Sequence, residues 1–377
     1  MDIGLSEEQE ILKASARDFL ARECPKKLVK ELDESDKGYS PELWRKMAEL
    51  GWMGLVFPEE YDGSGGAFRD LVVLLEEMGY NILPGPFFST IVLGGLPILK
   101  AGSEEQKKKF LSRIARGELI LTMALTEPTA SYDASAIAVK ASPRNSEYSI
   151  NGTKLFVTDA NVADYLLCVA RTKETANPQT GITIFVVDAK TPGIKCTLLE
   201  TLARDKQNEV VFDNVNVAKE NIVGGLDQGW PVIQDTLEKA AVAKCAEMVG
   251  GAQATLEMAV NYAKERIQFN RPIGTFQAVQ HYCANMVTDV DGARYITYKA
   301  AWELSEGLPA TKSVAMAKAW VGDAYQRVTM LGQQVFGAIG FTMDHDMHLY
   351  YRRARAGAMA FGNSNFHREV VAKELGL

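Results

Sequence analysis

The chain has 377 residues, of which 47% are hydrophobic and 24% are charged. This is the composition of a globular protein long enough for two or three domains. The formal net charge of −7 excludes the overall basic surface that is typical of nucleic-acid-binding proteins. No apolar run reaches the roughly 18 residues of a membrane-spanning helix, so we expect no membrane span.

The cysteines and histidines indicate reduced thiols and no metal site. Five cysteines occur, an odd number, and no CxxC pair is present, which favours a reducing compartment. His345 and His348 lie three residues apart but lack a third candidate ligand. The first 20 residues have neither the basic nor the apolar region of a signal peptide. We therefore expect a cytoplasmic protein without metal.

Residues 1–118 are predicted to form a helical domain. Ser6 and Gln9 have the spacing of a capping box, which predicts a helix start. Pro41 follows Ser40 at a first-turn position that tolerates proline, which predicts a second helix. The glycine-rich stretch 57–66 is a predicted loop. Further helices are predicted over Phe68–Met78 and Glu104–Arg116.

Residues 119–226 are predicted to form a small β domain. The apolar run Leu119–Leu125 precedes several short segments rich in β-branched and aromatic residues. Turn pairs at Asn151-Gly152 and Pro192-Gly193 separate them. The predicted strands are Glu147–Ile150, Leu155–Val157, Tyr165–Ala170, Gly181–Val187 and Val210–Phe212.

Residues 227–377 are predicted to form a helical bundle, with helices over Gly251–Arg266, Phe276–Gly307 and Thr311–Phe336 and from about Asp346. Helices, strands and helices in separate blocks predict an α+β fold rather than an alternating one. No GxGxxG or P-loop motif follows a predicted strand, which excludes the usual dinucleotide-binding folds.

Four segments in this order carry a family resemblance. They are Leu125-Thr126-Glu127-Pro128 with Asp133, residues 151–158 (NGTKLFVT), residues 265–274 (ERIQFNRPIG) with Phe276-Gln277, and residues 334–341 (QVFGAIGF). Each segment is weak alone, but four in register on a helix–sheet–helix plan are specific. The chain resembles the acyl-CoA dehydrogenase family over essentially its whole length. The resemblance implies bound FAD and an acyl-CoA substrate.

The resemblance implies roles for four residues of the β domain. Leu125 and Thr126 would meet the pyrimidine edge of the flavin, where a hydroxyl and backbone N–H groups can bond it. Phe156 would cover one face of the flavin ring, leaving the other face for substrate. Thr158, two residues on and on the same face of the strand, would lie near flavin N5.

The helical bundle would supply the remaining FAD contacts, partly to a neighbouring subunit. Four residues resemble those that reach the pyrophosphate and adenosine, and arginine suits a pyrophosphate because it donates two parallel hydrogen bonds. Asn363 and Asn365 would add further contacts. A homodimer or homotetramer follows, or a hetero-oligomer with a related subunit. The four residues are Arg266, Phe269, Gln334 and Gly337.

Judged singly, each of these residues also has a structural interpretation. Thr126 and Thr158 are compatible with ordinary strand positions, and Phe156 and Phe269 with a core. Arg266 is compatible with a solvated charge at a helix end. Only the four segments together favour the flavin site.

The resemblance leaves the catalytic base unplaced. Relatives carry a glutamate shortly after the fourth segment, and the matching position here is Phe361. A second family position for the glutamate matches Ala240. Neither side chain can accept a proton, although the Phe361 backbone N–H could polarise a thioester carbonyl.

Glu247 is the predicted replacement base. On a helix it shares a face with Ala240, Ala243 and Gly250 or Gly251, and these small residues are predicted to leave room for a large ligand. Desolvation on that face would raise the pKa of the carboxyl. The segment resembles that of a subgroup, including dehydrogenases for steroid side chains, that uses a glutamate here. The alternative is an exposed Lys244–Glu247 ion pair.

The predicted substrate residues are Ser89, Tyr132, Glu238 and Phe361. Ser89 lies in the proline- and glycine-rich stretch 83–95, which resembles the lining of the acyl pocket. Tyr132 replaces a small residue and would narrow the thioester site. Glu238 would lie near CoA, whose usual arginine partner is replaced by Ala241.

These features predict an FAD-dependent acyl-CoA dehydrogenase. It would perform α,β-desaturation of a bulky, cyclic, branched or aryl-bearing acyl-CoA and pass electrons to an electron-transfer flavoprotein. Two alternatives stay open. The chain could be a non-catalytic subunit that completes FAD sites in a hetero-oligomer, or it could perform a different flavin chemistry on the same scaffold.

Overall fold

The computed structural model describes residues 4–377. By compactness the chain divides into two units, which we treat separately. The helical unit comprises residues 4–29, 67–83 and 238–377, and the sheet unit comprises residues 30–66 and 84–237. The division falls within the long helix α7 (Trp230–Glu265). The helix–sheet–helix order along the chain confirms the predicted α+β class. The three domain boundaries read from composition stay predictions.

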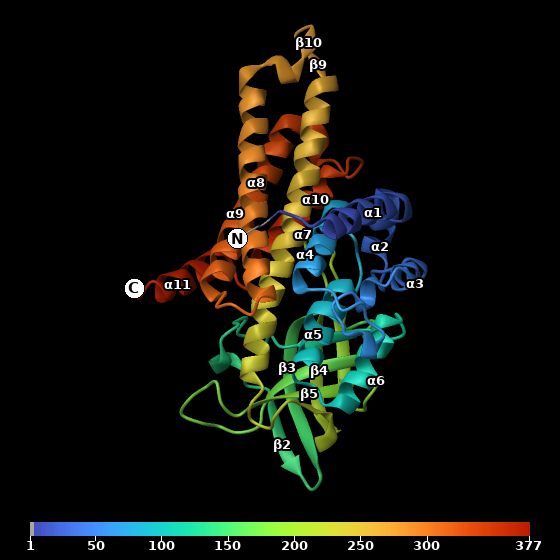
Figure 1. The fold of residues 1–377 in the computed structure, drawn as a ribbon, viewed down its shortest axis with the longest axis vertical. Helices are drawn as coiled ribbons and strands as arrows, with labels where there is room; N and C mark the ends of the chain where they lie inside the picture. Colours follow the sequence, from blue (N-terminus) through green and yellow to red (C-terminus); the bar gives the residue numbers. More distant parts are fainter. Residues whose placement is uncertain (1–3) are drawn as a thin grey trace. The chain divides into compact units, whose positions relative to one another are not determined.

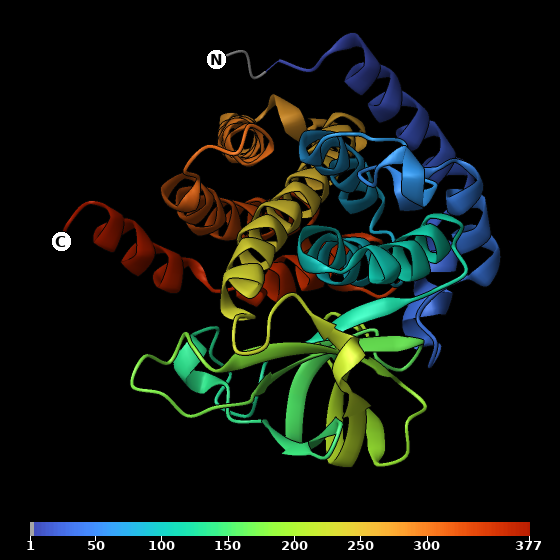
Figure 2. The same cartoon turned by 60° about the horizontal axis from the view of Figure 1, so that its bottom comes forward.

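The sheet unit is built on one mixed sheet (Figures 1 and 2). Its strands follow the order β6-β7-β3-β2-β4-β5-β8, and β1 pairs with β4 in parallel. The inner side chains, including Ile150, Phe185 and Phe212, form a closed core. The strands are β1 (Leu121–Ala124), β2 (Lys140–Arg144), β3 (Glu147–Thr158), β4 (Tyr165–Arg171), β5 (Ile182–Asp188), β6 (Ile194–Leu199), β7 (Gln207–Ala218) and β8 (Ile222–Val223).

The prediction of a turn at Asn151-Gly152 was wrong. These residues lie inside β3, which runs unbroken along β7 and shifts register between Ile150 and Gly152. The bulge accommodates both turn-type residues, because Gly152 adopts a φ of 138° and Asn151 Oδ1 accepts a hydrogen bond from the Asn214 backbone N–H at 2.8 Å. One long strand therefore replaces the two predicted short ones.

The other predicted strands, at β4, β5 and β7, are confirmed, and the Pro192-Gly193 pair forms the predicted turn. The sequence analysis missed β2 and β6. Both strands are largely exposed, so they do not alternate between buried and exposed side chains in the way on which strand prediction depends.

The predicted N-terminal helices are confirmed. Ser6 Oγ accepts from the Gln9 backbone N–H, and the Gln9 side chain accepts from the Ser6 N–H, which completes the capping box. Short helices at α2 and α5 and a π-helix at Ser89–Gly95 were not predicted. The helices are α1 (Glu7–Glu23), α2 (Lys26–Glu34), α3 (Pro41–Glu49), α4 (Phe68–Asn81), α5 (Leu96–Ala101) and α6 (Glu104–Ala115).

The helical unit contains long antiparallel helices, with α7 and α8 side by side in Figure 1. The predicted start of α7 at Gly251 was about six turns late, because the helix continues from Trp230 through the alanine-rich stretch. The predicted final helix divides into two at residues 360–363. The elements are α8 (Gln277–Ser305), α9 (Thr311–Phe336), α10 (Met347–Met359) and α11 (Ser364–Glu374).

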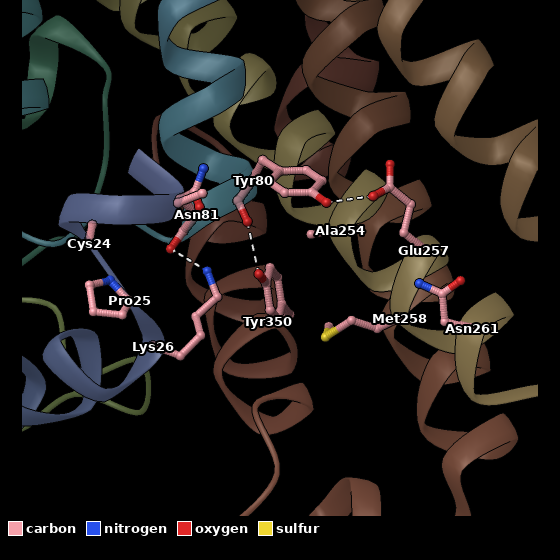
Figure 3. A pocket seen from close by; sticks show the side chains of 11 residues that line it. Cys24, Pro25, Lys26, Tyr80, Asn81, Ala254, Glu257, Met258, Asn261 and Tyr350 are labelled. Carbon is pink, nitrogen blue, oxygen red and sulfur yellow. Dashed lines mark hydrogen bonds between the residues drawn. The ribbon is translucent and has the colours of Figure 1, made fainter. Parts of the chain in front are cut away.

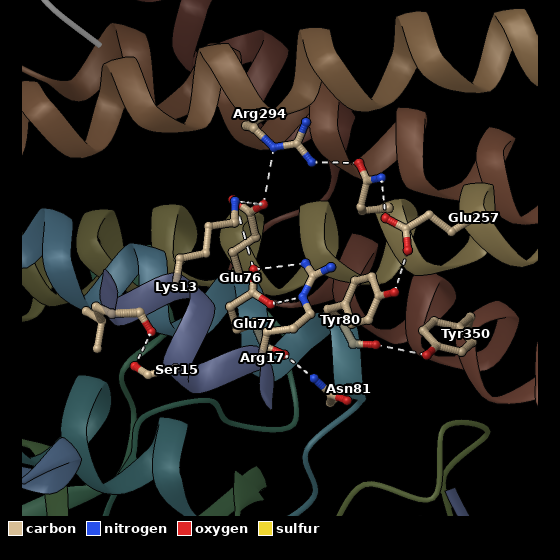
Figure 4. A network of polar contacts seen from close by, with 12 residues as sticks. Lys13, Ser15, Arg17, Glu76, Glu77, Tyr80, Asn81, Glu257, Arg294 and Tyr350 are labelled. Carbon is tan, nitrogen blue, oxygen red and sulfur yellow. Dashed lines mark hydrogen bonds and ion pairs between the residues drawn. The ribbon is translucent and has the colours of Figure 1, made fainter. Parts of the chain in front are cut away.

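A buried ionic network fixes α1 to α4 (Figure 4). Lys13 Nζ lies 2.9 Å from Glu76 Oε1, and Arg17 Nε lies 2.5 Å from Glu77 Oε2. Arg294 of α8 also reaches Glu76 Oε1, at 3.2 Å. Burial opposes ionisation of Glu76, but Lys13 and Arg294 outweigh it, so its pKa is lowered. The two buried carboxylates thereby hold three helices together.

The helices α4 and α7 cross with their backbones in contact. A Cβ added to Gly250 would lie 1.8 Å from the Glu76 carbonyl oxygen, and one added to Gly79 would lie 2.0 Å from the Glu247 carbonyl oxygen. Such distances exclude any side chain. Gly250 and Gly251 of α7 therefore pack directly against neighbouring residues of the helical unit. The prediction that they leave room for a ligand was wrong.

Gly250→Ala should destabilise the protein by about 1–3 kcal/mol, because the added methyl overlaps backbone that cannot move independently. Gly292→Ala on α8 is the matched control. Its nearest neighbour, Trp320 Nε1, would lie 3.5 Å away, so helix propensity should leave the control neutral or stabilise it by up to about 1 kcal/mol. Urea unfolding measures both variants, and equal stabilities would contradict the packing described.

Candidate functional site

The turn at Leu125 and Thr126 is held by a buried ion pair. Lys154 is fully buried in β3, and its Nζ donates to the Leu125 carbonyl at 3.0 Å and to Glu127 Oε1 at 2.7 Å. Glu127 also accepts from the backbone N–H groups of Ala138 and Val139. Burial lowers the pKa of Lys154, against the opposing charge of Glu127. The pair fixes the backbone after β1 to the strand that carries Phe156.

The same turn is bonded directly to β3. The Leu155 N–H donates to the Thr126 carbonyl at 2.8 Å, and Thr122 Oγ1 donates to the Thr158 carbonyl at 2.7 Å. All four flavin-facing residues predicted in this unit therefore lie on two adjoining segments. Lys154 and Glu127 both lie within the segments that carry the family resemblance, but neither was predicted as a site residue. Only their burial distinguishes them from surface charges.

Phe156 lies at a second bulge of β3 and presents its ring to the outside. Its φ of 54° is left-handed, and the register against β7 shifts between Lys154 and Val157. The Phe156 side chain is 52% exposed, whereas Val157 is 1% exposed. Residues held in such strained conformations cluster at active sites and ligand-binding sites. Thr158 is half-buried, and its hydroxyl lies 3.3 Å from Gln207 Oε1.

Four more predicted residues gather at one end of the helical unit. Arg266 follows α7 directly and leads into a hairpin of β9 (Ile267–Gln268) and β10 (Arg271–Pro272). Gln334 and Gly337 lie at the end of α9. The two regions adjoin because Tyr262 of α7 contacts Phe336, with ring centroids 4.5 Å apart.

This end of the helical unit has the features of a ligand or subunit contact. Phe269 at the hairpin tip is 85% exposed with a φ of 52°. Gly337 has a φ of 67° and no heavy atom within 4 Å of an added Cβ, so its backbone is open to approach. Arg266 and Gln334 are exposed. An arginine, an amide, an aromatic ring and open backbone suit the pyrophosphate and adenosine of FAD.

The two asparagines support local structure. Asn363 caps α11, where its Oδ1 accepts from the Phe366 N–H at 2.9 Å. Asn365 Oδ1 accepts from the Arg368 guanidinium at 2.9 Å. Their side-chain oxygens therefore already have donors, and contacts with FAD stay a prediction for both.

Neither family position for the base holds a carboxylate. Phe361 lies between α10 and α11 with a left-handed φ of 56°, and Ala240 is fully buried in α7. The carbonyl of Phe361 accepts a hydrogen bond from His367 Nε2 at 2.8 Å.

Glu247 is paired with Lys244 through its Oε2, and the two side chains are 23% and 21% exposed. It is therefore neither the lone carboxylate of the first expectation nor part of an exposed pair. The Lys244 side chain lies near α10, since its Cδ would be 4.0 Å from a Cβ at Gly357. Gly357 is one helical turn before Phe361. The structure thus places the Lys244 side chain near the helix that precedes Phe361.

Two of the predicted substrate residues form hydrogen bonds with residues of their own unit. Ser89 is fully buried, and its hydroxyl donates to Asp159 Oδ2 at 2.6 Å. Glu238 accepts from Thr311 Oγ1 at 2.7 Å. Tyr132 is half-buried in the segment before Asp133. Contact of these residues with substrate stays a prediction.

A separate pocket of about 310 Å³ lies in the helical unit between α1, α2, α4, α7 and α10 (Figure 3). It contains none of the predicted site residues. Lys26 Nζ donates to the Asn81 carbonyl at 2.7 Å, and Tyr80 Oη donates to Glu257 Oε2 at 2.5 Å. Burial lowers the pKa of Lys26 to about 8. The pocket residues Lys26 and Tyr80 thus already form hydrogen bonds with other residues that line the pocket.

Three family models match the chain in sequence order. They describe the acyl-CoA dehydrogenase N-terminal domain over residues 6–118, the middle domain over residues 122–215 and the C-terminal domain over residues 227–376. The chain belongs to the acyl-CoA dehydrogenase family.

Relatives of known name match this acyl-CoA dehydrogenase over their full length. A 3-(aryl)acrylate reductase of Clostridium sporogenes is 34% identical, over 98% of this chain and 99% of its own. The subunit CarC of a caffeyl-CoA reductase-Etf complex of Acetobacterium woodii is 30% identical, over 97% and 98%. The ChsE4-ChsE5 complex from Mycobacterium tuberculosis gives a TM-score of 0.91 at 28% identity, over 100% of this chain and 99% of that chain.

The protein is accordingly an FAD-dependent oxidoreductase that acts on the CH–CH bond of an acyl-CoA. FAD is its cofactor, and the exposed Phe156, the clamped turn at Thr126 and the open backbone at Gly337 fit it. Within residues 4–377, no helix is long and apolar enough to cross a membrane.

Lys154→Met should destabilise the protein by about 3–5 kcal/mol, because it leaves the Glu127 carboxylate buried without its partner. The double variant Lys154→Met/Glu127→Leu should recover most of that loss, since no charge stays buried. Lys140→Met, at an exposed position of β2, is the control. Urea unfolding followed by tryptophan fluorescence gives the free energies, and a single variant as stable as the control would contradict the clamp.

Arg266→Gln should weaken FAD retention by about tenfold or more, because a charge-assisted hydrogen bond to the pyrophosphate is lost. Arg271→Gln is the matched control in the same hairpin, since Arg271 lies over the Phe276 ring at 4.1 Å. The ratio of absorbance at 450 and 280 nm after gel filtration reports bound FAD. Equal losses in both variants would count against a specific role for Arg266.

Proposed function

We propose that this enzyme interconverts a bulky, cyclic, branched or aryl-bearing acyl-CoA and its α,β-unsaturated counterpart, with Glu247 as the acid–base residue. The observation that carries the proposal is the location of the Lys244–Glu247 pair. The Lys244 side chain lies near Gly357 of α10, four residues before Phe361, the position that matches the family's glutamate in sequence. The carboxylate paired with this lysine is therefore our candidate for the missing base.

The chemistry requires a proton acceptor and a hydride acceptor. In desaturation, the carboxylate of Glu247 takes the α-proton of the thioester. Bound FAD would supply the acceptor for the β-hydrogen and its electron pair. In the reverse direction, protonated Glu247 returns the proton to the α-carbon. The ion pair with Lys244 limits the conformations of Glu247, which favours a defined position for the proton acceptor.

The names of two relatives favour a non-linear acyl group. Gly94 and Gly95 pack against Leu121 and Phe57, with a Cβ at either position less than 3.0 Å from those side chains. The π-helix at Ser89–Gly95 is a local irregularity of the type that recurs at functional sites. Two relatives are named for aryl acrylates or caffeyl-CoA. An aryl-bearing acyl group is the substrate class that these observations favour most.

The proposed electron partner is an electron-transfer flavoprotein. One relative is a subunit of a complex with Etf, and a solved structure from work on the electron transferring flavoprotein of Acidaminococcus fermentans is similar to this chain, with a TM-score of 0.92 at 32% identity. The exposed residues Phe269 and Gly337 support a homo-oligomer in which one copy contacts the FAD of another.

A second candidate is the FAD-site-completing subunit of a hetero-oligomer. Phe361 and Ala240 at both family base positions favour it, as does the likeness to a complex of two different chains. Phe156 and the clamped Thr126 turn argue against it, because they equip this chain to hold its own flavin ring. Purified protein distinguishes the two, since a colourless chain that gains flavin only with a second subunit supports the alternative.

Glu247→Gln should slow anaerobic bleaching of the flavin by an aryl-propionyl-CoA by roughly 10²–10⁴-fold, because the amide cannot accept the proton. Glu257→Gln, on the same helix and bonded to Tyr80, is the control. Linear acyl-CoAs of matched size complete the panel. Unchanged bleaching in Glu247→Gln would remove this residue from the mechanism, and a strong preference for butyryl- or octanoyl-CoA would contradict the proposed substrate class.

A further inference from the structure

The segment 358–362, which contains the vacated base position, has a backbone that requires external support. Phe361 and Gly362 adopt successive left-handed conformations, with φ of 56° and 94°. For a bulky residue such as phenylalanine, this conformation is an outlier that persists only when surrounding contacts enforce it. A Cβ at Gly362 would lie 2.5 Å from Phe366 Cδ1 and 2.9 Å from His367 Nε2, so only glycine fits there.

Lys318 of α9 supplies that support from the interior. Its side chain is fully buried, and its Nζ donates to the Ala358 carbonyl at 3.1 Å and to the Gly362 carbonyl at 2.9 Å. The Ala358 carbonyl belongs to the last turn of α10, where helix geometry leaves acceptors without partners. A cation at that end also complements the helix dipole. One ammonium group thus bridges both sides of Phe361.

His367 holds the carbonyl of Phe361 itself. Burial lowers the pKa of His367 to about 4, so the ring is neutral near pH 7. The nitrogen that faces a carbonyl must then carry the hydrogen, which assigns the proton to Nε2. Its Nδ1 is buried and has no hydrogen-bond partner among the described residues. Lys318 and His367 therefore bind three of the carbonyls of the segment.

We propose that Lys318 is a positioning residue of the active site, which acts by holding segment 358–362 in its left-handed shape. This inference rests on the proposed function, in which that segment and Glu247 meet the thioester. The Lys244 side chain pairs with Glu247 and lies near Gly357, one residue before this segment. Loss of the anchor would let the segment relax, so it would change the geometry around the thioester without removing any reacting group.

The protonation of Lys318 gives the proposal a pH dependence. Burial lowers its pKa to about 8; Cys245 and Asp323 oppose that shift, Lys244 adds to it, and neutral His367 also faces the group. Below about pH 8 the ammonium makes charge-assisted hydrogen bonds, and above it a neutral amine holds the carbonyls less strongly. Flavin reduction should therefore slow as the pH rises through about 8.

The stability of the fold should change with pH in the opposite sense. The folded protein releases the Lys318 proton near pH 8, whereas the unfolded chain keeps it to about pH 10.4. Between these values the unfolded state binds more protons, so the Lys318 contribution to stability rises with pH. This slope should vanish in Lys318→Met, which separates the protonation of the lysine from any effect on catalysis.

The test compares Lys318→Met and Lys318→Arg with the control Lys299→Met on α8, whose amine bonds Ser313 and Glu303. Amide hydrogen exchange of residues 358–367 is measured in the holoenzyme without substrate. We expect at least about tenfold faster exchange there in Lys318→Met and no change in the control. Lys318→Gln repeats the measurement if Lys318→Met does not fold. Exchange equal to that of the control in the variant that folds would overturn the proposal.

Anaerobic flavin reduction by an aryl-propionyl-CoA gives the second readout. We expect a roughly tenfold or greater fall in the maximal rate for Lys318→Met with a smaller change in the apparent Kd, and no slowing near pH 8 in Lys318→Arg. If no acyl-CoA bleaches even the wild type, the proposed function is wrong. The exchange experiment then still tests whether Lys318 holds segment 358–362 in place. An unchanged rate beside accelerated exchange would overturn the positioning role.

Discussion

The candidate flavin site depends on one buried ion pair, between Lys154 and Glu127. Taking both charges out of water is costly, and the pair persists because each partner has further hydrogen bonds, Lys154 to the Leu125 carbonyl and Glu127 to two backbone N–H groups. With these bonds in place, the turn after β1 and the bulged end of β3 form one rigid surface. This surface holds Phe156 in its left-handed conformation with its ring exposed. In an isolated strand, the backbone would relax from that conformation.

A second constraint comes from the close crossing of α4 and α7. Because Gly79 and Gly250 bring the two backbones into contact, α7 is fixed in rotation about its own axis. That rotation determines where Lys244 and Glu247 point, and it places the Lys244 side chain near Gly357 of α10. The small residues of α7 thus position the acid–base candidate, although they provide no space for a ligand around Gly250 and Gly251.

The segment around Phe361 keeps a left-handed backbone that contacts from the interior hold in place. Phe361 cannot accept a proton, but the segment around it is still held by Lys318 and His367 and still requires Gly362. The left-handed conformation of Phe361 and the burial of the Lys318 amine both cost free energy. Such costly features are concentrated at functional sites. The retained geometry is consistent with a role for the backbone near Phe361 while the proton is handled by α7.

The sequence by itself determined the helix–sheet–helix order and the family, because periodicity, capping residues and four ordered motifs are local properties of the chain. The FAD-facing segments, and the assignment of Phe361 and Ala240 to the family's base positions, stay predictions from the resemblance. Only the tertiary structure decided that Asn151-Gly152 is a bulge, that Glu127 and Lys154 are buried together, and that Glu247 pairs with Lys244. Those outcomes depend on which segments distant in sequence pack against one another, and burial and hydrogen-bond partners exist only after that packing.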